Sequence, residues 1–150
     1  MTKYDILKYY EIALRDVENI IGVNSTSNFR IDKICMRIIP NYLGTFSSNN
    51  IPRMKNDTCC IVNTDSNNKP GTHWTCLFKY KDKMYFYDSF ARDYKILSPY
   101  WKHKKWINTN TNDADQSLYE KDCASRSIAW LLTFEKYKTK SINIIYYNLI

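Results

Sequence analysis

The sequence predicts a single α+β domain that spans residues 1–150, and three observations predict it. The chain has 150 residues, which is the usual length of one domain. Apolar residues recur at helical spacing before residue 40 and again after residue 122. Between these parts, residues 59–88 are rich in the β-branched and aromatic residues that favour strands. Helices, then strands, then a helix is an order typical of an α+β domain.

Two amphipathic helices are predicted at the start of the chain. Residues 4–21 place an apolar side chain every three or four positions, as one buried helix face requires. A second helix is predicted over residues 29–39, because Pro40 disfavours helical geometry in the residue before it. Residues 41–55 contain a Gly, a Pro and a Ser-Ser-Asn-Asn run, so this segment is predicted to be loop.

A strand and a β-hairpin are predicted next. Residues 59–64 form a short apolar run that is typical of a buried strand. Residues 73–80 and 83–88 are two β-rich runs separated only by Lys81-Asp82, a spacing that predicts a hairpin with a two-residue turn. In that register, residues that face each other have numbers that sum to 163.

The other segments carry weaker patterns. Residues 65–71 are a turn-rich loop, a short helix is predicted near residues 94–101, and residues 108–115 are predicted to be exposed loop. Residues 123–138 again show helical periodicity. For residues 142–150, a strand and a final helix are both compatible with the sequence.

The cysteines and histidines argue against a metal site. The chain has five cysteines, an odd number, and no C-x-x-C pair. It has only two histidines, so the ligand set of a structural zinc site is missing. We therefore expect neither a metal nor a framework of disulfides.

Charge and hydropathy limit the partners. The net charge of +7 favours an acidic partner, such as nucleic acid or a polyanionic substrate. No apolar run approaches the roughly 18 residues of a membrane span. Lys3, Asp5 and Lys8 interrupt the first helix, which argues against a signal peptide. We expect a protein that is kept in the cytoplasm or nucleus, is not secreted and has no membrane partner.

The hairpin register predicts that an imidazole meets a carboxylate. His73 lies opposite Phe90 and diagonal to Asp88, and His73 and Asp88 share one face of the sheet. Diagonal neighbours are within reach of long side chains. A slip of one residue would place the two on opposite faces. The alternative interpretation of this pair alone is an ordinary ion pair or a half-buried histidine.

Cys123 is the candidate nucleophile. It opens a predicted helix after a polar loop, and the positive end of the helix dipole favours a thiolate there. The other four cysteines lie within apolar runs and fit the role of small buried side chains. Gln116 lies seven residues before Cys123, and its amide together with the Cys123 N–H could stabilise an oxyanion. Alternatively, Gln116 is an ordinary loop residue.

Several of these segments occur in the same order in a known family. They are Leu43–Phe46, Cys60–Thr64, Gly71–Trp74, Tyr87–Phe90, Gln116 and Cys123. On these residues the chain resembles the adenain family of adenovirus-type maturation proteases, and its relatives among Ulp-type peptidases and those of virophages and large DNA viruses. The similarity runs from about residue 43 to residue 132.

The resemblance implies a fold and a role for each site residue. The fold would be papain-like α+β, with a mixed sheet packed against the helix that carries the nucleophile. Two N-terminal helices, at about 4–39, would precede a catalytic core at about 43–138. The nucleophile would be Cys123, the base His73 and its acidic partner Asp88. The oxyanion amide and the aromatic wall of the site would be Gln116 and Trp74.

The resemblance also implies a function. Members of the family cleave capsid and core precursors at small-residue, Gly-Gly-like sites during virion maturation, so we expect this protein in the virion and the infected host cell. The chemistry would need no cofactor, although viral DNA acts as an activator in adenain. A candidate DNA site here is the basic run of Lys102, Lys104 and Lys105. A solvated basic face is the alternative.

Two features depart from the family. Ala124 follows the nucleophile where the family nearly always has Gly, and no cysteine lies between residues 77 and 122 to hold a disulfide-linked activator. Two other functions remain open. One is a deubiquitinase-like or acyltransferase activity on the same triad, and the other is a non-catalytic, DNA-bound virion protein on a decayed protease fold.

Overall fold

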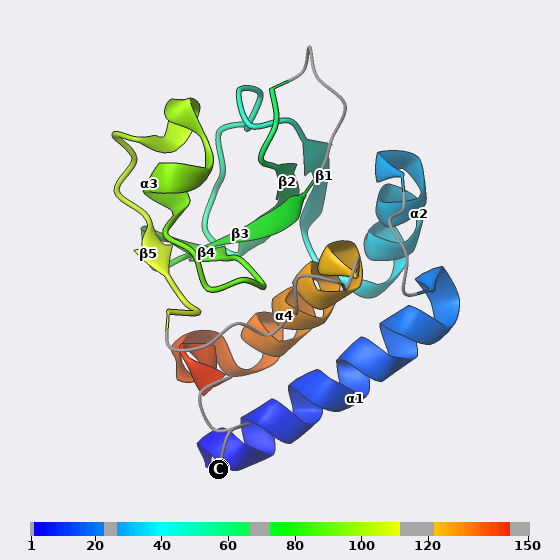
Figure 1. The fold of residues 1–150 in the computed structure, drawn as a ribbon. Helices are drawn as coiled ribbons and strands as arrows, with labels where there is room; N and C mark the ends of the chain where they lie inside the picture. The colour runs from blue at the N-terminus through cyan, green and yellow to red at the C-terminus, as the bar shows by residue number, and fades with distance from the viewer. Residues whose placement is uncertain (1, 23–26, 67–72, 112–121, 145–150) are drawn as a thin grey trace.

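The computed structural model describes residues 2–22, 27–66, 73–111 and 122–144. It has an α+β architecture with one mixed, open sheet of five strands (Figure 1). The strands are β1 (Tyr42–Phe46), β2 (Thr58–Asn63), β3 (Trp74–Tyr80), β4 (Lys83–Tyr87) and β5 (Ile107–Asn108). The helices are α1 (Lys3–Ile21), α2 (Asn28–Ile38), α3 (Tyr94–Leu97) and α4 (Cys123–Tyr137), with 3-10 turns η1 (Pro99–Trp101) and η2 (Lys138–Ser141).

The strands follow one another in the sheet in chain order, from β1 to β5. The two outer pairs, β1–β2 and β4–β5, are parallel, and the central strands β2, β3 and β4 are antiparallel. The central strands therefore form a hairpin-based unit, and a short parallel strand extends it at each edge.

Alternate residues of the central strands enter two separate cores. Cys59, Ile61, Cys76 and Phe78 face the main core under α4, whereas Cys60, Val62 and Leu77 face a second core. Met54, Tyr94 and Trp101 complete the second core from the loop after β1 and from the α3–η1 segment. Both faces of the sheet are therefore covered, which explains why β2 is a continuous apolar run.

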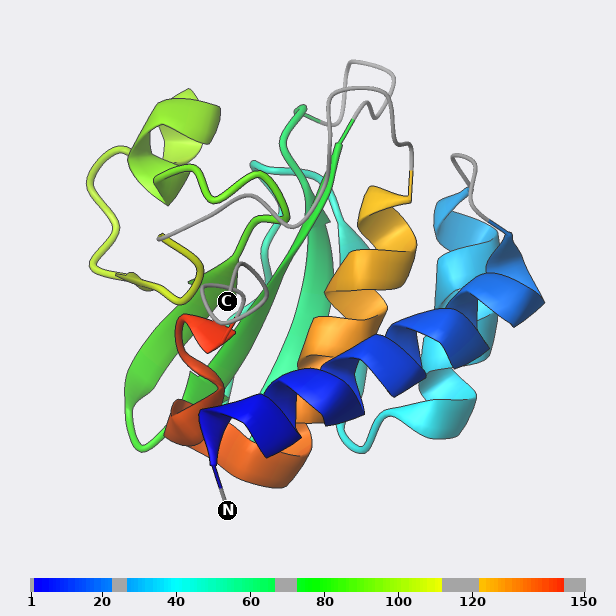
Figure 2. The same cartoon turned by 60° about the horizontal axis from the view of Figure 1, so that its bottom comes forward.

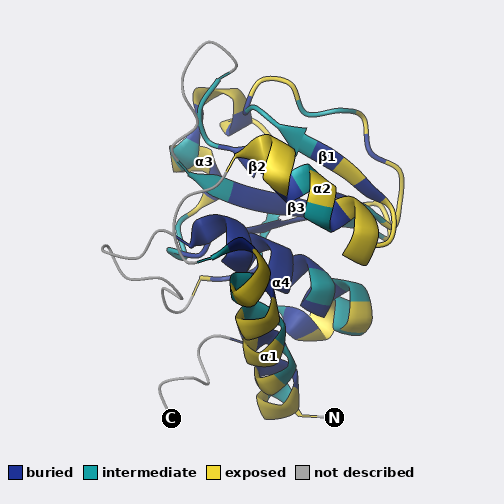
Figure 3. Ribbon diagram, turned by 90° about the vertical axis from the view of Figure 1, so that its right-hand side faces the viewer, coloured by how far each residue is buried: buried dark blue, intermediate teal, exposed yellow. Residues whose placement is uncertain are grey.

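Helix α4 is the central helix. It packs across β3 and is buried on most of its surface, while α1 lies over its outer side (Figures 2 and 3). Helix α1 begins with a capping box between Thr2 and Asp5 and ends at Gly22, where φ is +96°. None of the helices in the described part of the chain combines the length and apolar character that crossing a bilayer requires.

The hairpin has the predicted register. Tyr80 faces Lys83 and Cys76 faces Tyr87, so the residue numbers of each pair sum to 163. The turn residues Lys81 and Asp82 both have positive φ, +49° and +64°, as a type I′ turn requires. Asn56 supports this turn from the neighbouring loop, because its side chain donates to Asp82 Oδ1 (3.0 Å) and accepts from the Asp82 N–H (2.8 Å).

Some predictions were wrong. The segment 41–55, predicted as loop, contains β1. The segment 108–115, predicted as exposed loop, shares Asn108 with β5, and its next two residues, Thr109 and Asn110, are buried. The helix near 94–101 is two short pieces, because Ser98 is extended (φ −152°, ψ 136°) before Pro99. In the tail, residues 142–144 form no strand, and residues 145–150 lie outside the described part.

Candidate active site

The β3–β4 hairpin brings His73 and Asp88 together. His73 directly precedes β3 and Asp88 directly follows β4, so both lie at the open end of the hairpin. His73 Nε2 is 2.5 Å from Asp88 Oδ1. The side chain of His73 is 12% exposed and that of Asp88 is 0% exposed. The predicted contact is therefore present, and it lies in a largely buried environment.

Backbone contacts fix the position of His73. Its carbonyl oxygen accepts a hydrogen bond from the Thr64 N–H (3.0 Å), and the next residue, Trp74, pairs with Asn63 of β2. With Nε2 engaged by Asp88, Nδ1 is the ring nitrogen that remains for a second partner.

That second partner is Cys123, the first residue of α4. Its side chain lies close enough to His73 to raise the pKa of the imidazole, and its Sγ accepts a hydrogen bond from the Trp74 N–H (3.4 Å). Ser127, one turn further along α4, donates to the Trp74 carbonyl (3.3 Å). Contacts from one turn of α4 to the start of β3 therefore hold the thiol beside the imidazole.

A charged cluster fixes the start of α4. Asp122 forms an ion pair with Arg126 (Nε–Oδ1 2.9 Å), and Glu18 of α1 lies beside it. Burial raises the pKa of Asp122, but its contacts with Glu18 and Arg126 outweigh burial and lower the pKa overall. Helix α1 is thereby attached to the turn of α4 that carries the nucleophile candidate.

Arg92 holds the carboxylate from its other side. Its Nε donates to Asp88 Oδ2 (2.8 Å), its backbone N–H donates to the same oxygen (3.1 Å), and its Nη2 lies 3.4 Å from Oδ1. The intervening residue Ala91 has φ +58°, and its N–H donates to the Asp88 carbonyl (2.9 Å). This tight turn is what brings Arg92 back onto Asp88.

Phe90 covers the pair. Its ring centroid lies 5.3 Å from that of His73, and the Arg92 guanidinium lies 4.9 Å from its centre. Asn110, which follows β5, donates to the Asp88 carbonyl (3.2 Å). The imidazole, the phenyl ring and the guanidinium thus enclose a carboxylate that water does not reach.

The charges in the site favour an ionised pair. Burial lowers the pKa of His73, but hydrogen bonds with Asp88 and Cys123 and the charges of these groups outweigh burial and raise it to about 9. Burial raises the pKa of Asp88, but its hydrogen bonds with His73 and Arg92 outweigh burial and lower it. At neutral pH, His73 is therefore an imidazolium paired with the Asp88 carboxylate.

The other four cysteines differ from Cys123. All are buried within the two cores, and burial raises the pKa of each thiol, to about 12 for Cys59. None of the five forms a disulfide. The four are therefore weak nucleophiles at neutral pH.

A scan against models of protein families found no match, and neither did a search of curated proteins. The chemical interpretation of the site therefore depends on its own residues. A thiol, an imidazole and a carboxylate in contact at a helix N-terminus form the arrangement that nucleophilic acyl transfer uses.

The remaining predicted residues have different positions. Trp74 is half-buried beside Cys123, and its backbone N–H touches the sulfur. Gln116 lies outside the described residues. Lys102, Lys104 and Lys105 are exposed in the loop after η1.

The aromatic residues that frame this basic loop are packed inward. Trp101 is 0% exposed and its indole N–H donates to the Ser48 carbonyl (3.0 Å). Trp106 packs against Phe86, Tyr94 and Trp101 in the second core. Trp101 is therefore closed to a stacking base and Trp106 is half-buried, whereas Lys102, His103, Lys104 and Lys105 are exposed.

Ala124 is also buried, at 3% exposed, and belongs to the main core. Its methyl group therefore packs inward. Among the described residues, no three His, Cys, Asp or Glu side chains are grouped as a metal ion would require.

Sequence analysis missed Arg92 and the Trp74 N–H. The spacing of Asp88 and Arg92, four residues apart, was visible in the sequence. It did not predict contact, because these residues follow a strand and are not helical.

Proposed function

We propose that this protein is a cysteine endopeptidase in which Cys123 attacks the scissile carbonyl and His73 is its base. The observation that carries the proposal is the contact of His73 with both Cys123 and the buried Asp88. A thiolate is the reactive form of a cysteine, and a base held in place by a carboxylate is the group that generates one.

The proposed mechanism moves one proton in each half-reaction. The Cys123 thiolate adds to the carbonyl carbon, and the carbonyl oxygen becomes an oxyanion. The His73 imidazolium gives its proton to the leaving amine as the C–N bond breaks, which leaves a thioester and a neutral imidazole. His73 then takes a proton from water, whose oxygen attacks the thioester. Release of the acid restores the thiolate and imidazolium.

The surrounding residues support these steps. The Trp74 N–H stabilises negative charge on Cys123 Sγ, and Asp88 stabilises the imidazolium. We assign the oxyanion to the Cys123 N–H at the start of α4 and to the Gln116 amide. The helix N-terminus supplies an unpaired N–H for this purpose.

We further propose that the fold is of the papain-like, adenain type and that the substrates are capsid or core precursors. The support is the ordered set of matching segments, together with an α4 that carries the nucleophile and packs on a mixed sheet. The protein would act in the virion and the infected cell, and would cut at small-residue, Gly-Gly-like sites.

Fluorogenic peptides with Gly-Gly before the scissile bond test the activity. Cys123→Ala and His73→Ala should abolish turnover, whereas Cys60→Ala, which removes a buried core thiol, should keep its rate per folded molecule. Normal cleavage by Cys123→Ala refutes the assignment. Labelling by a ubiquitin-like C-terminal probe, without cleavage of capsid-precursor peptides, would indicate a deubiquitinase-like enzyme. Transfer of the acyl group to an added amine would indicate an acyltransferase.

DNA is the proposed activator, bound by Lys102, Lys104 and Lys105. The loop that carries them is held in place by Tyr94, whose hydroxyl donates to the Lys104 carbonyl (2.6 Å) and accepts from the Trp106 N–H (3.0 Å). Replacing the three lysines with Ala should weaken duplex DNA binding and lower the slope of log affinity against log salt by about 3. Unchanged binding would exclude this loop. DNA binding without any peptidase activity would favour the non-catalytic virion protein.

A further inference from the structure

A groove separates α1 and α2 on the outside of the molecule. Helix α1 packs on α4 and α2 packs on β1, and α2 stands beside the C-terminal part of α1 (Figure 1). Two hollows open along the groove, of about 460 Å³ and about 280 Å³, and Ile20 lines both. None of the residues that line the hollows belongs to the candidate active site.

The floor of this groove is apolar and open to solvent. The exposed fraction is 48% for Ile12, 54% for Ile20, 77% for Phe29 and 38% for Ile38. Ile12 and Ile20 lie about two turns apart on the same side of α1. Single exposed apolar side chains are common on protein surfaces, but several gathered in one groove mark a binding site.

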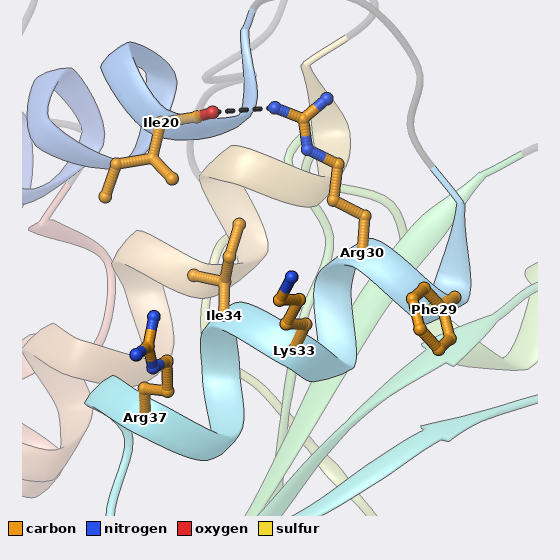
Figure 4. Close-up of a pocket in the computed structure, with 6 residues that line it drawn as sticks. All are labelled: Ile20, Phe29, Arg30, Lys33, Ile34 and Arg37. Atoms are coloured by element: carbon orange, nitrogen blue, oxygen red, sulfur yellow. Dashed lines mark hydrogen bonds between the residues drawn. The ribbon is translucent and has the colours of Figure 1, made fainter.

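One edge of the groove is basic. Arg30, Lys33 and Arg37 line the larger hollow from α2 and point toward α1, on either side of Ile34 (Figure 4). Arg30 donates to the Ile20 carbonyl (2.8 Å) and so caps α1. Within the described part of the chain, neither Lys33 nor Arg37 forms an ion pair.

The acidic residue of α2 does not neutralise this edge. Asp32 accepts hydrogen bonds from Tyr42 (3.2 Å) and Thr45 (2.9 Å) of β1, so it faces the sheet. The larger hollow has no acidic lining residue, and the smaller one has only Asp16. The groove therefore presents an apolar floor beside uncompensated positive charge.

We infer that this groove docks an amphipathic helix of a partner protein, with an apolar stripe on the floor and acidic residues along α2. Ile12 and Ile20 are about 12 Å apart along α1, at 1.5 Å per residue. The anchors of an amphipathic helix at positions i, i+4 and i+7 span a similar length, about 10 Å. The charge edge requires acidic residues on one flank of that helix. Nucleic acid would supply phosphates for the basic edge but nothing for the apolar floor. A lipid bilayer would need apolar side chains that protrude from the surface, whereas these line a groove.

The experiment measures binding of a labelled synthetic peptide to the full chain by fluorescence anisotropy. The peptide has about 18 residues, with Leu at helical i, i+3, i+4 and i+7 spacing and Glu on the flank. A second peptide has the same composition with the Leu positions scrambled. The variant is Lys33→Glu with Arg37→Glu. Its matched control is Arg53→Glu with Lys55→Glu, which makes the same charge change in an exposed loop outside both proposed binding sites.

The patterned peptide should bind wild type at least about tenfold more tightly than the scrambled one, and should shift the methyl NMR signals of Ile12, Ile20 and Ile38. Binding should fall about tenfold or more in the groove variant and much less in the control. Equal losses in both variants, or equal binding of both peptides, would refute the proposal. Phosphatidylserine vesicles and duplex DNA are tested with the same variants. The proposal would also be refuted if the groove variant, but not the control, lost binding to vesicles or DNA while its binding to the peptide was unchanged. Because the readout is binding, the result does not depend on peptidase activity.

Discussion

Replacing Asp88 with Asn tests the electrostatics of the site most directly. The Asn side chain keeps the size of Asp88 but removes its charge. The pKa of His73 should then fall from about 9 toward its ordinary value near 6.5, because burial, which lowers it, is then opposed by Cys123 alone. At about 1.4 kcal/mol for each tenfold change in proton affinity, the difference between 9 and 6.5 corresponds to about 3 kcal/mol. This is the net amount by which Asp88 and Cys123 together exceed the opposing effect of burial.

Imidazole NMR measures this change without a substrate. The chain has only two histidines, so comparison with His73→Ala assigns the two sets of ring signals. In wild type, His73 should titrate near pH 9, and in Asp88→Asn it should titrate well below that value. The same titration in Cys123→Ala isolates the contribution of the carboxylate. A His73 that titrates near the ordinary value of 6.5 in wild type, or one that stays near pH 9 in Asp88→Asn, would refute the reasoning.

The shifts also fix the sign of the stability difference. The raised pKa of His73 contributes stability that is complete below about pH 6.5 and is lost as the pH rises through about 9. The lowered pKa of Asp88 contributes stability that is present above about pH 4 and is lost as the pH falls through the lowered value. Urea unfolding should therefore show the largest advantage of wild type over Asp88→Asn between about pH 4 and pH 6.5.

Three further predictions concern the same region. Iodoacetamide at pH 7 should modify Cys123 before the four core cysteines, as read by mass spectrometry, and His73→Ala should slow the modification of Cys123. Equal labelling of all five thiols would contradict this prediction. Arg92→Ala should lower peptidase turnover about tenfold and raise the pKa of Asp88. In Arg92→Lys, both quantities should lie between those of Arg92→Ala and wild type, because Lys keeps the charge but not the forked geometry of the guanidinium. An unchanged pH–rate profile in Arg92→Ala would exclude this positioning role. Ala91→Gly should raise the free energy of unfolding by about 1 kcal/mol in urea titrations. The reason is that φ is +58° at this position, which is a steric cost for Ala and not for Gly. A loss of stability would contradict this prediction.

The part of the site that lies on the hairpin could be predicted from the sequence. The two-residue turn and the alternation of side chains place His73 and Asp88 on one face, and these are local properties of residues 73–88. The contact with Cys123 depends on how α4 packs against β3. In the sequence, this contact was indicated by the position of a cysteine at a helix start and by the resemblance to the adenain family.

Other features depend on partners that the local sequence does not reveal. Strand β1 is short, contains Gly44 at φ +137° and has an irregular register with β2, so it forms only because the edge of β2 is available. Arg92 reaches Asp88 through a turn at Ala91 that no residue preference announces. Trp101 and Trp106 flank the basic run in the sequence, and the structure places both in the second core, where Trp101 is buried and Trp106 is partly buried.

The candidate triad is divided unequally between two structural units. Its imidazole and carboxylate belong to one hairpin and are 15 positions apart, whereas Cys123 is 49 positions from Trp74, the hairpin residue it touches. A nascent chain that has formed only the hairpin therefore holds a base with no nucleophile. The candidate nucleophile joins this pair only when α4 docks across β3, so a single packing contact between helix and strand decides whether the three groups meet.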